Sequence, residues 1–155
     1  MQRIFIWFIL IFLGIDLITK TWAEFTLRIG EKKETIIPYI NWHLLHNKGM
    51  SFSILDDYPD VVFVINLIAV VVVGILLSKL MKSFVWYLAG ALIIGGALGN
   101  FVNRLFLGHV IDFISVKGYP AIFNVADIEI RIGMVLILFL SIKEYITEKR
   151  KIRGT

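Results

Sequence analysis

Long apolar stretches alternate with polar segments along the chain, and this pattern determines the predicted architecture. Four stretches are almost entirely apolar, and they cover residues 4–18, 61–77, 84–98 and 132–146. A helix that crosses a hydrocarbon core of ~30 Å needs ~20 residues at a rise of ~1.5 Å, so neighbouring residues must extend each stretch. The sequence therefore predicts a single integral membrane domain over residues 1–155, with transmembrane helices at approximately 4–20, 61–79, 84–101 and 127–146.

The first apolar stretch has an alternative interpretation as a cleavable signal peptide. Arg3 would form its charged region, and the Thr-Trp-Ala sequence at residues 21–23 would be a poor cleavage site. Asp16 within the stretch and Lys20 at its edge favour a retained helix, because the apolar region of a signal peptide carries no charges.

The distribution of positive charge predicts that both termini are cytoplasmic. Under that orientation eight Lys and Arg residues lie in short cytoplasmic flanks, and the other eight are spread over much longer outer segments. The density of Lys and Arg beside the ends of spans is what sets membrane orientation. The cytoplasmic set consists of Arg3, Lys79, Lys82, Lys143, Lys149, Arg150, Lys151 and Arg153.

Composition excludes several classes of function. Hydrophobic residues make up 58% of the chain and the mean hydropathy is +0.82, more apolar surface than one soluble core of this length can bury. The absence of cysteine excludes disulfides, thiolate metal sites and Cys nucleophiles. The 16 Lys and Arg residues lie mostly beside apolar runs rather than on one polar face, so membrane lipids are expected partners and nucleic acid is not.

The two outward-facing segments, residues 22–60 and 101–126, contain most of the polar residues. Within the first, the β-rich residues 35–37 and 39–42 predict a short sheet lying on the membrane. Pro38 would restrict this part of the sheet to an edge strand.

Polar residues in or near the predicted spans indicate where the functional site lies. A charged side chain inside a span costs about 3 kcal/mol on insertion scales, so these residues require an explanation. All of them except Asn66 group near the outer membrane boundary, and we interpret Asn66 as an interhelical hydrogen-bond partner. The set comprises Asp16, Asn66, Asn100, Arg104, Asp112, Asn124 and Asp127.

Small residues recur along the third span. Ala91, Gly95 and Gly99 stand at four-residue intervals, a spacing that predicts close approach of a neighbouring helix. Such packing would hold Asn100 and Arg104 rigidly on one helix face.

Asp112 and Asp127 are the main candidates for catalysis, and the turn signal at residues 118–120 lets the chain reverse between them. Two carboxyls in a low-dielectric site do not both ionise readily, so one retains a proton while the other is charged. The charged carboxylate can activate water, and the protonated one can donate a hydrogen bond to a scissile carbonyl. Taken singly, each Asp has the alternative interpretation of a helix cap or an ion-pair partner, and Arg131 is the obvious partner for Asp127.

Other catalytic chemistries have less support. His43, His46 and His109 could be combined into a metal site, but the chain has no HExxH motif, and no metal is predicted. Ser51 and Ser53 lie in no nucleophile elbow.

Five sequence blocks, in this order, resemble the lipoprotein signal peptidases, also called signal peptidase II. Each block is short, but the ordered set covers nearly the whole chain. The blocks are Asp16-Leu17-Ile18-Thr19-Lys20, Asn47-Lys48-Gly49-Met50-Ser51-Phe52-Ser53, Gly95-Gly96-Ala97-Leu98-Gly99-Asn100-Phe101-Val102-Asn103-Arg104, Val110-Ile111-Asp112-Phe113 and Phe123-Asn124-Val125-Ala126-Asp127.

The resemblance implies a fold class and an activity. The fold would be an all-α membrane protein, a four-transmembrane-helix bundle of N-in/C-in topology with a small extracytoplasmic β-cradle. The activity would be that of an aspartyl endopeptidase of the bacterial cytoplasmic (inner) membrane, with its site facing outward. It would remove signal peptides from diacylglyceryl-modified prolipoproteins just before the lipidated cysteine, without a cofactor, and globomycin would inhibit it. We expect a monomer.

The same motif matching assigns roles to individual residues. Asp112 and Asp127 would be the catalytic pair. The substrate-binding or site-supporting residues would be Asn47, Gly49, Asn100, Arg104, Asn124, Asp16 and Lys20.

The chain departs from the family pattern near both carboxylates. Asn103 stands where the family usually has Asp, and Glu129 and Arg131 stand where it usually has small or hydroxyl residues. An ion pair between Arg131 and Asp127 would favour the charged carboxylate and disturb proton sharing. The alternative function is therefore a catalytically inactive or altered-specificity paralogue that binds lipoproteins or lipids. A solute carrier would instead require polar residues near the bilayer midplane.

Overall fold

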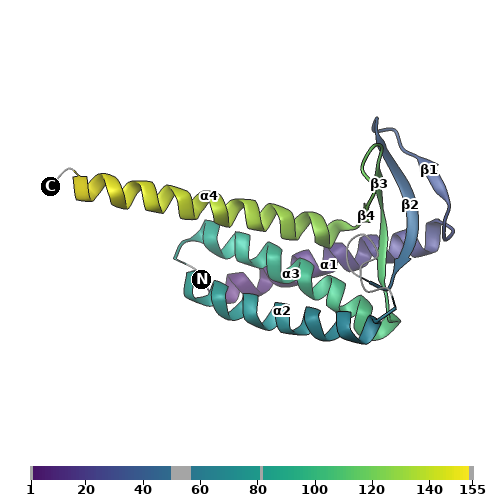
Figure 1. Ribbon diagram of the computed structural model, residues 1–155, viewed down its shortest axis with the longest axis horizontal. Coiled ribbons are helices and arrows are strands. Elements are labelled where there is room, and N and C mark those ends of the chain that lie inside the picture. Colours follow the sequence, from purple (N-terminus) through teal and green to yellow (C-terminus); the bar gives the residue numbers. More distant parts are fainter. Residues whose placement is uncertain (1, 50–56, 81, 154–155) are drawn as a thin grey trace.

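The computed structural model describes residues 2–49, 57–80 and 82–153, and in this part of the chain four helices carry a small antiparallel sheet at one end (Figure 1). In chain order the elements are α1 (Gln2–Thr26), β1 (Lys32–Glu34), β2 (Ile40–Asn47), α2 (Pro59–Leu80), α3 (Phe84–Leu107), β3 (Val110–Val116), β4 (Ile122–Phe123) and α4 (Val125–Arg153).

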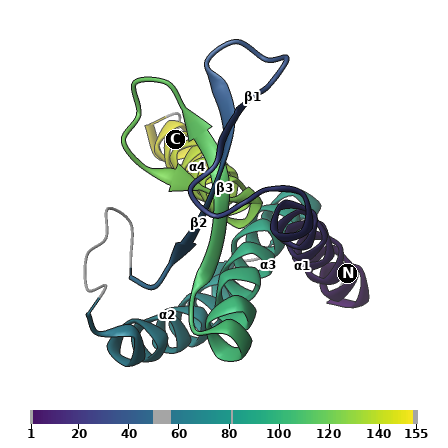
Figure 2. The same ribbon diagram turned by 90° about the vertical axis from the view of Figure 1, so that its right-hand side faces the viewer.

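Helix α3 is the centre of the bundle, because α1, α2 and α4 all pack against it (Figure 2). Its glycines allow these approaches. A side chain on Gly95 would meet the Cβ of Phe12 in α1 at 2.8 Å, and one on Gly96 would meet the carbonyl oxygen of Ala126 in α4 at 2.6 Å. The predicted close packing of the third span is therefore confirmed, and it involves two different neighbours.

Gly99 brings α3 against a buried carboxylate, and it provides a first test. A Cβ at this position would collide with the Asp16 carboxylate. We expect Gly99→Ala to displace Asp16 and to destabilise the protein by about 1–3 kcal/mol, as overpacking of a core does. The midpoint of thermal unfolding in detergent measures the effect. Gly74→Ala is the matched control, because no atom lies within 4 Å of the new Cβ; equal midpoints for the two variants would contradict the packing described here.

The sheet has the strand order β1-β2-β3-β4, and every neighbouring pair is antiparallel. It packs on the C-terminal end of α1, where Trp22 forms edge contacts with Trp42 of β2 and Phe113 of β3 at centroid distances of 5.2 and 6.1 Å. Buried Leu44 and Ile111 complete this small core. The sheet therefore fixes β3, the strand that carries Asp112, over the ends of the helices.

The observed sheet differs from the predicted one. The β-rich residues 35–37 form no strand; instead the Thr35 hydroxyl donates to the carbonyl oxygens of Ile37 and Ile40, and Tyr39 adopts a positive φ of 68°. These local bonds compete with strand pairing around Pro38. Strands β3 and β4, which lie in the second outer segment, were not predicted.

Three described helices are long and apolar enough to cross a membrane: Arg3–Thr26, Asp60–Leu77 and Phe84–Leu107. Helix α4 has 29 residues, but it carries Asp127, Glu129 and Arg131 near its start and many charges near its end. Its composition therefore does not identify it as a span in the way the other three are identified. The interpretation of Asn66 was wrong, because its side chain donates to the Val62 carbonyl of its own helix at 2.9 Å.

Candidate active site

A cleft of about 270 Å³ lies where the sheet meets the C-terminal end of α3 and the N-terminal end of α4. Both candidate carboxylates, Asp112 and Asp127, line it, together with Asn47, Asn100 and Arg104. The cleft thus brings together polar residues from β2, from β3 and from two helices.

Asp112 is 2% exposed and lies on β3, which forms one side of the cleft. Each of its oxygens accepts a hydrogen bond from a neutral amide: Asn124 Nδ2 lies 2.6 Å from Oδ1, and Asn47 Nδ2 lies 2.9 Å from Oδ2. Burial, followed by the negative charge of Asp127, raises the pKa of Asp112 to about 7, while the two amide donors act in the opposite direction. This carboxyl can therefore carry a proton near neutral pH.

Asp127 is fixed by the start of α4. Asn124 precedes the first helical residue, and its Oδ1 accepts the Asp127 backbone N–H at 3.1 Å. The Asp127 carboxylate in turn accepts the Asn124 backbone N–H at 3.2 Å, which makes a reciprocal capping box. Asn100 Nδ2 donates to the other Asp127 oxygen at 3.0 Å. The hydrogen bonds that cap α4 therefore also hold Asp127 in its place in the cleft.

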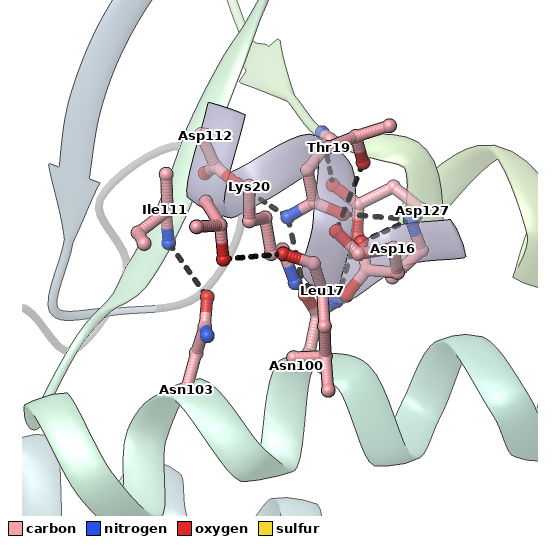
Figure 3. A network of polar contacts seen from close by, with 12 residues as sticks. Asp16, Leu17, Thr19, Lys20, Asn100, Asn103, Ile111, Asp112 and Asp127 are labelled. Atoms are coloured by element: carbon pink, nitrogen blue, oxygen red, sulfur yellow. Dashed lines mark hydrogen bonds and ion pairs between the residues drawn. The ribbon is translucent and has the colours of Figure 1, made fainter. Parts of the chain in front are cut away.

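Asn100 connects the two carboxylates to a buried ion pair (Figure 3). Its Oδ1 accepts hydrogen bonds from Asn124 Nδ2 at 3.1 Å and from Lys20 Nζ at 2.7 Å. Lys20 also lies 2.7 Å from Asp16, and both side chains are at most 1% exposed. Asp16 accepts the backbone N–H of Ala126 at 2.9 Å, so α1 is tied directly to the first turn of α4.

Arg104 joins the C-terminal end of α3 to the segment after β2. Its Nη2 donates to the Gly49 carbonyl oxygen at 2.8 Å. The Gly49 backbone N–H donates to Asn47 Oδ1 at 3.1 Å, and this bond orients the Asn47 amide towards Asp112. Arg104 therefore acts on the cleft partly through Gly49 and Asn47.

Comparisons with known proteins agree with this geometry. A family model described as signal peptidase (SPase) II matches residues 8–143. The chain belongs to the signal peptidase II family.

Curated relatives and solved structures place the chain in the same group. It is similar to lipoprotein signal peptidases of Mycobacterium leprae (38% identity, 84% of this chain and 67% of the relative) and Fusobacterium nucleatum (35%, 88% and 85%). A third such relative, from Streptococcus pneumoniae, is 34% identical over 89% of this chain and 92% of its own. A bacterial membrane enzyme determined at 2.3 Å resolution superposes with a TM-score of 0.79 and 29% identity, covering 92% of this chain and 90% of the other. Membership of the family identifies a membrane protease.

The structure brings all the predicted site residues of this family member into one connected network. Two chains of hydrogen bonds start from Asp112, one through Asn47 and Gly49 to Arg104, the other through Asn124 to Asn100. From Asn100 the network reaches Asp127, Lys20 and Asp16. The nine residues are Asp112, Asp127, Asn47, Gly49, Asn100, Arg104, Asn124, Asp16 and Lys20.

Two of the three departures from the family pattern, Arg131 and Asn103, have structural explanations. The ion pair between Arg131 and Asp127 does not form; the Arg131 guanidinium instead lies over the Phe123 ring, 5.1 Å from its centroid. Asn103 Oδ1 accepts the backbone N–H of Ile111 at 3.2 Å and so fixes the start of β3. Neither residue removes a partner from the two carboxylates.

Of the three histidines considered as metal ligands, only His46 and His109 lie together. His46 contacts Glu24 of α1 at 2.9 Å and its ring stacks on that of His109. His43 lies opposite Lys32 in the backbone pairing of β2 with the edge strand β1. Among residues 2–49, 57–80 and 82–153, no three His, Asp or Glu side chains are grouped as metal ligands would be. Ser51 and Ser53 lie outside the described residues.

Sequence reasoning missed one buried carboxyl. Glu129 of α4 is 6% exposed and lies within electrostatic range of Asp16 and Lys20. The residue was noted only as a departure from the family pattern. The spacing of Glu129 from Ala126 could have indicated its burial. Glu129 follows Ala126 by three residues and therefore lies on the helix face that contacts Asp16.

Proposed function

We propose that this protein is an intramembrane aspartyl endopeptidase that removes signal peptides from diacylglyceryl-modified prolipoproteins, cleaving just before the lipidated cysteine. One observation carries the proposal: two carboxyls from different segments line one cleft, and each of their oxygens has an amide N–H donor. Neutral donors orient the carboxyls without neutralising them. Family membership supports a protease with prolipoprotein substrates.

The chemistry follows from a pair that holds one proton. The charged carboxylate accepts a proton from a water molecule, and the oxygen of that water attacks the scissile carbonyl carbon. The protonated carboxyl donates to the carbonyl oxygen as negative charge develops there. Collapse of the tetrahedral intermediate breaks the C–N bond, and the amine of the cysteine leaves with a proton from the pair. The pair is thereby returned to its starting state of one proton.

The surrounding residues would position the pair rather than react. Asn47 and Asn124 hold both oxygens of Asp112, and Asn100 holds Asp127. Lys20 adds a positive charge behind Asn100 without binding either carboxylate of the pair directly. This complete network favours an active enzyme over a paralogue that only binds lipoproteins or lipids.

The membrane arrangement belongs to the same proposal. We infer that α4 crosses the bacterial cytoplasmic membrane as the fourth span, that both termini are cytoplasmic, and that the cleft faces the outer side. The crowding of Lys and Arg beside the ends of α2 and α4 supports this orientation. The protein would act as a monomer among membrane lipids.

The test is direct. Purified protein in detergent is incubated with a lipidated prolipoprotein, and the mobility shift on release of the signal peptide is followed by gel electrophoresis. We expect cleavage that globomycin inhibits. A protein that leaves the substrate intact, while an active signal peptidase II cleaves it in parallel, would refute the proposal.

The pH profile provides a second test. Catalysis requires one proton on the pair, so activity should fall as the pH rises through the pKa of Asp112, about 7. The Asn47 amide stabilises charged Asp112, so Asn47→Ala should raise this pKa further. We expect the alkaline limb of the kcat/KM profile to move to higher pH, by up to about one unit. Asn66→Ala is the control, and a limb that stays in place or moves to lower pH in Asn47→Ala would contradict the assignment.

A further inference from the structure

Arg131 lines the cleft but has no part in the reaction described above. It follows Asp127 by four residues, so both side chains lie on one face of α4. The Arg131 side chain is exposed, and its guanidinium carbon lies 5.1 Å from the centroid of the Phe123 ring in β4. The ring therefore draws the guanidinium towards the sheet, at the rim of the cleft.

The hydrogen-bond donors of Arg131 are available to a ligand. A cation–π contact uses the face of the guanidinium and leaves its N–H groups at the edge. In the described ranges, no carbonyl or carboxylate accepts a hydrogen bond from Arg131 and no acidic side chain pairs with it. An arginine presents five N–H donors in a planar fork that matches a carboxylate. Arg131 is thus a positioned cation without a described counter-ion.

The cleft as a whole has an excess of positive charge. Three cations line it, Lys48, Arg104 and Arg131, against the two carboxyls Asp112 and Asp127. If that pair holds one proton, a single negative charge remains. Lys48 is exposed and stands on the β2 side of the cleft, whereas Arg131 stands on the α4 side. A substrate that adds a negative charge between them would be favoured electrostatically.

We propose that Arg131, assisted by Lys48, is a specificity-determining residue that selects substrates with an acidic side chain shortly after the lipidated cysteine. The inference rests on the proposed function and deepens it. An anionic group must lie on that side of the scissile bond, because the residues before the cysteine belong to the signal helix in the membrane. A carboxylate there would cost several kcal/mol on insertion, whereas the residues after the cysteine leave towards water.

The experiment compares synthetic diacylglyceryl-modified peptides that differ only in the residue after the cysteine, which is Asp, Asn or Lys. With the wild-type protein in neutral detergent at low salt, we expect kcat/KM to be about fivefold to tenfold higher for the Asp peptide than for the Asn peptide, and lowest for the Lys peptide. High salt should reduce the difference, because the rim of the cleft is exposed to solvent.

Substitutions assign the preference to Arg131. Arg131→Gln should bring the ratio of Asp to Asn peptides close to one while the Asn peptide is cleaved at the wild-type rate, and Arg131→Lys should keep part of the preference. Lys117→Gln is the matched control, because Lys117 is an exposed outer cation that does not line the cleft. Cleavage of the Asn peptide reports on folding within each variant.

Three outcomes would overturn the inference: equal rates for the Asp and Asn peptides in the wild type, an unchanged preference in Arg131→Gln, or an equal loss for all three peptides in that variant. If the equal loss for all three peptides appears only when anionic lipid is added to the detergent, Arg131 binds a lipid phosphate and not the substrate. Failure of the wild type to cleave any of the peptides would instead refute the proposed function.

Discussion

Asp112→Asn and Asp127→Asn should each reduce cleavage of a lipidated prolipoprotein by at least about 1,000-fold. Asparagine preserves the size of the side chain but can neither accept a proton from water nor share one with its neighbour. The Asp112 variant should also lose one of its two hydrogen bonds, with Asn47 or with Asn124, since its amide nitrogen would face an amide donor. The initial rate of signal-peptide release measures both effects.

The control for this experiment is Asp60→Asn. Asp60 is an exposed carboxylate in the first turn of α2 and does not line the cleft, so its substitution should leave the rate unchanged. Thermal unfolding of all three variants separates loss of catalysis from loss of fold. If either cleft variant unfolds normally and still cleaves at a rate near that of the wild type, the assignment of the pair is wrong.

Lys20→Met should have the largest effect on stability. It removes the ammonium group that lies 2.7 Å from Asp16. The Asp16 carboxylate, which is fully buried, is then left without a counter-ion. Breaking a buried pair in this way costs about 3–5 kcal/mol. The Lys20 ammonium also holds Asn100, so the substitution should lower activity as well as the midpoint of thermal unfolding.

Two comparisons make this prediction specific. In the double variant Asp16→Asn/Lys20→Met the unpaired charge is gone, so part of the lost stability should return. Lys82→Met breaks an exposed pair with Glu144 at 2.8 Å, and solvent screening predicts little change there. Equal losses from Lys20→Met and Lys82→Met would show that the buried pair does not stabilise the bundle.

The helices could be predicted from the sequence because lipid imposes a simple rule, a run of about 20 apolar residues. The sheet could be predicted only in part: the β-rich residues 39–42 overlap β2, whereas β1 and β4 are only three and two residues long and give no clear sequence signal. Strand β3 was missed for another reason: its residues 110–116 are mostly buried, show no alternation of apolar and polar positions, and pair with β2, far away in the chain. The β-rich residues 35–37, by contrast, bond locally and form no strand.

The site residues were predictable because they are polar groups near lipid, where each one requires a partner. That reasoning, and the resemblance of five blocks to a known family, selected residues that the structure joins in one network. The sequence could not reveal which side chains each of these polar residues contacts. The alternative in which Arg131 pairs with Asp127, four residues away, is not what the structure shows, because the Arg131 guanidinium lies over the ring of Phe123. Buried Glu129 was overlooked because its burial depends on how α4 faces α1.

The central claim is tested most directly by the mass of the cleavage product. Purified protein is incubated with a diacylglyceryl-modified prolipoprotein and, in parallel, with the same chain lacking the lipid, and both products are analysed by intact mass spectrometry. We predict a mature protein that begins with the diacylglyceryl cysteine, and an unlipidated chain that stays intact. A cut at any other bond, or an uncleaved lipidated substrate, would contradict the account.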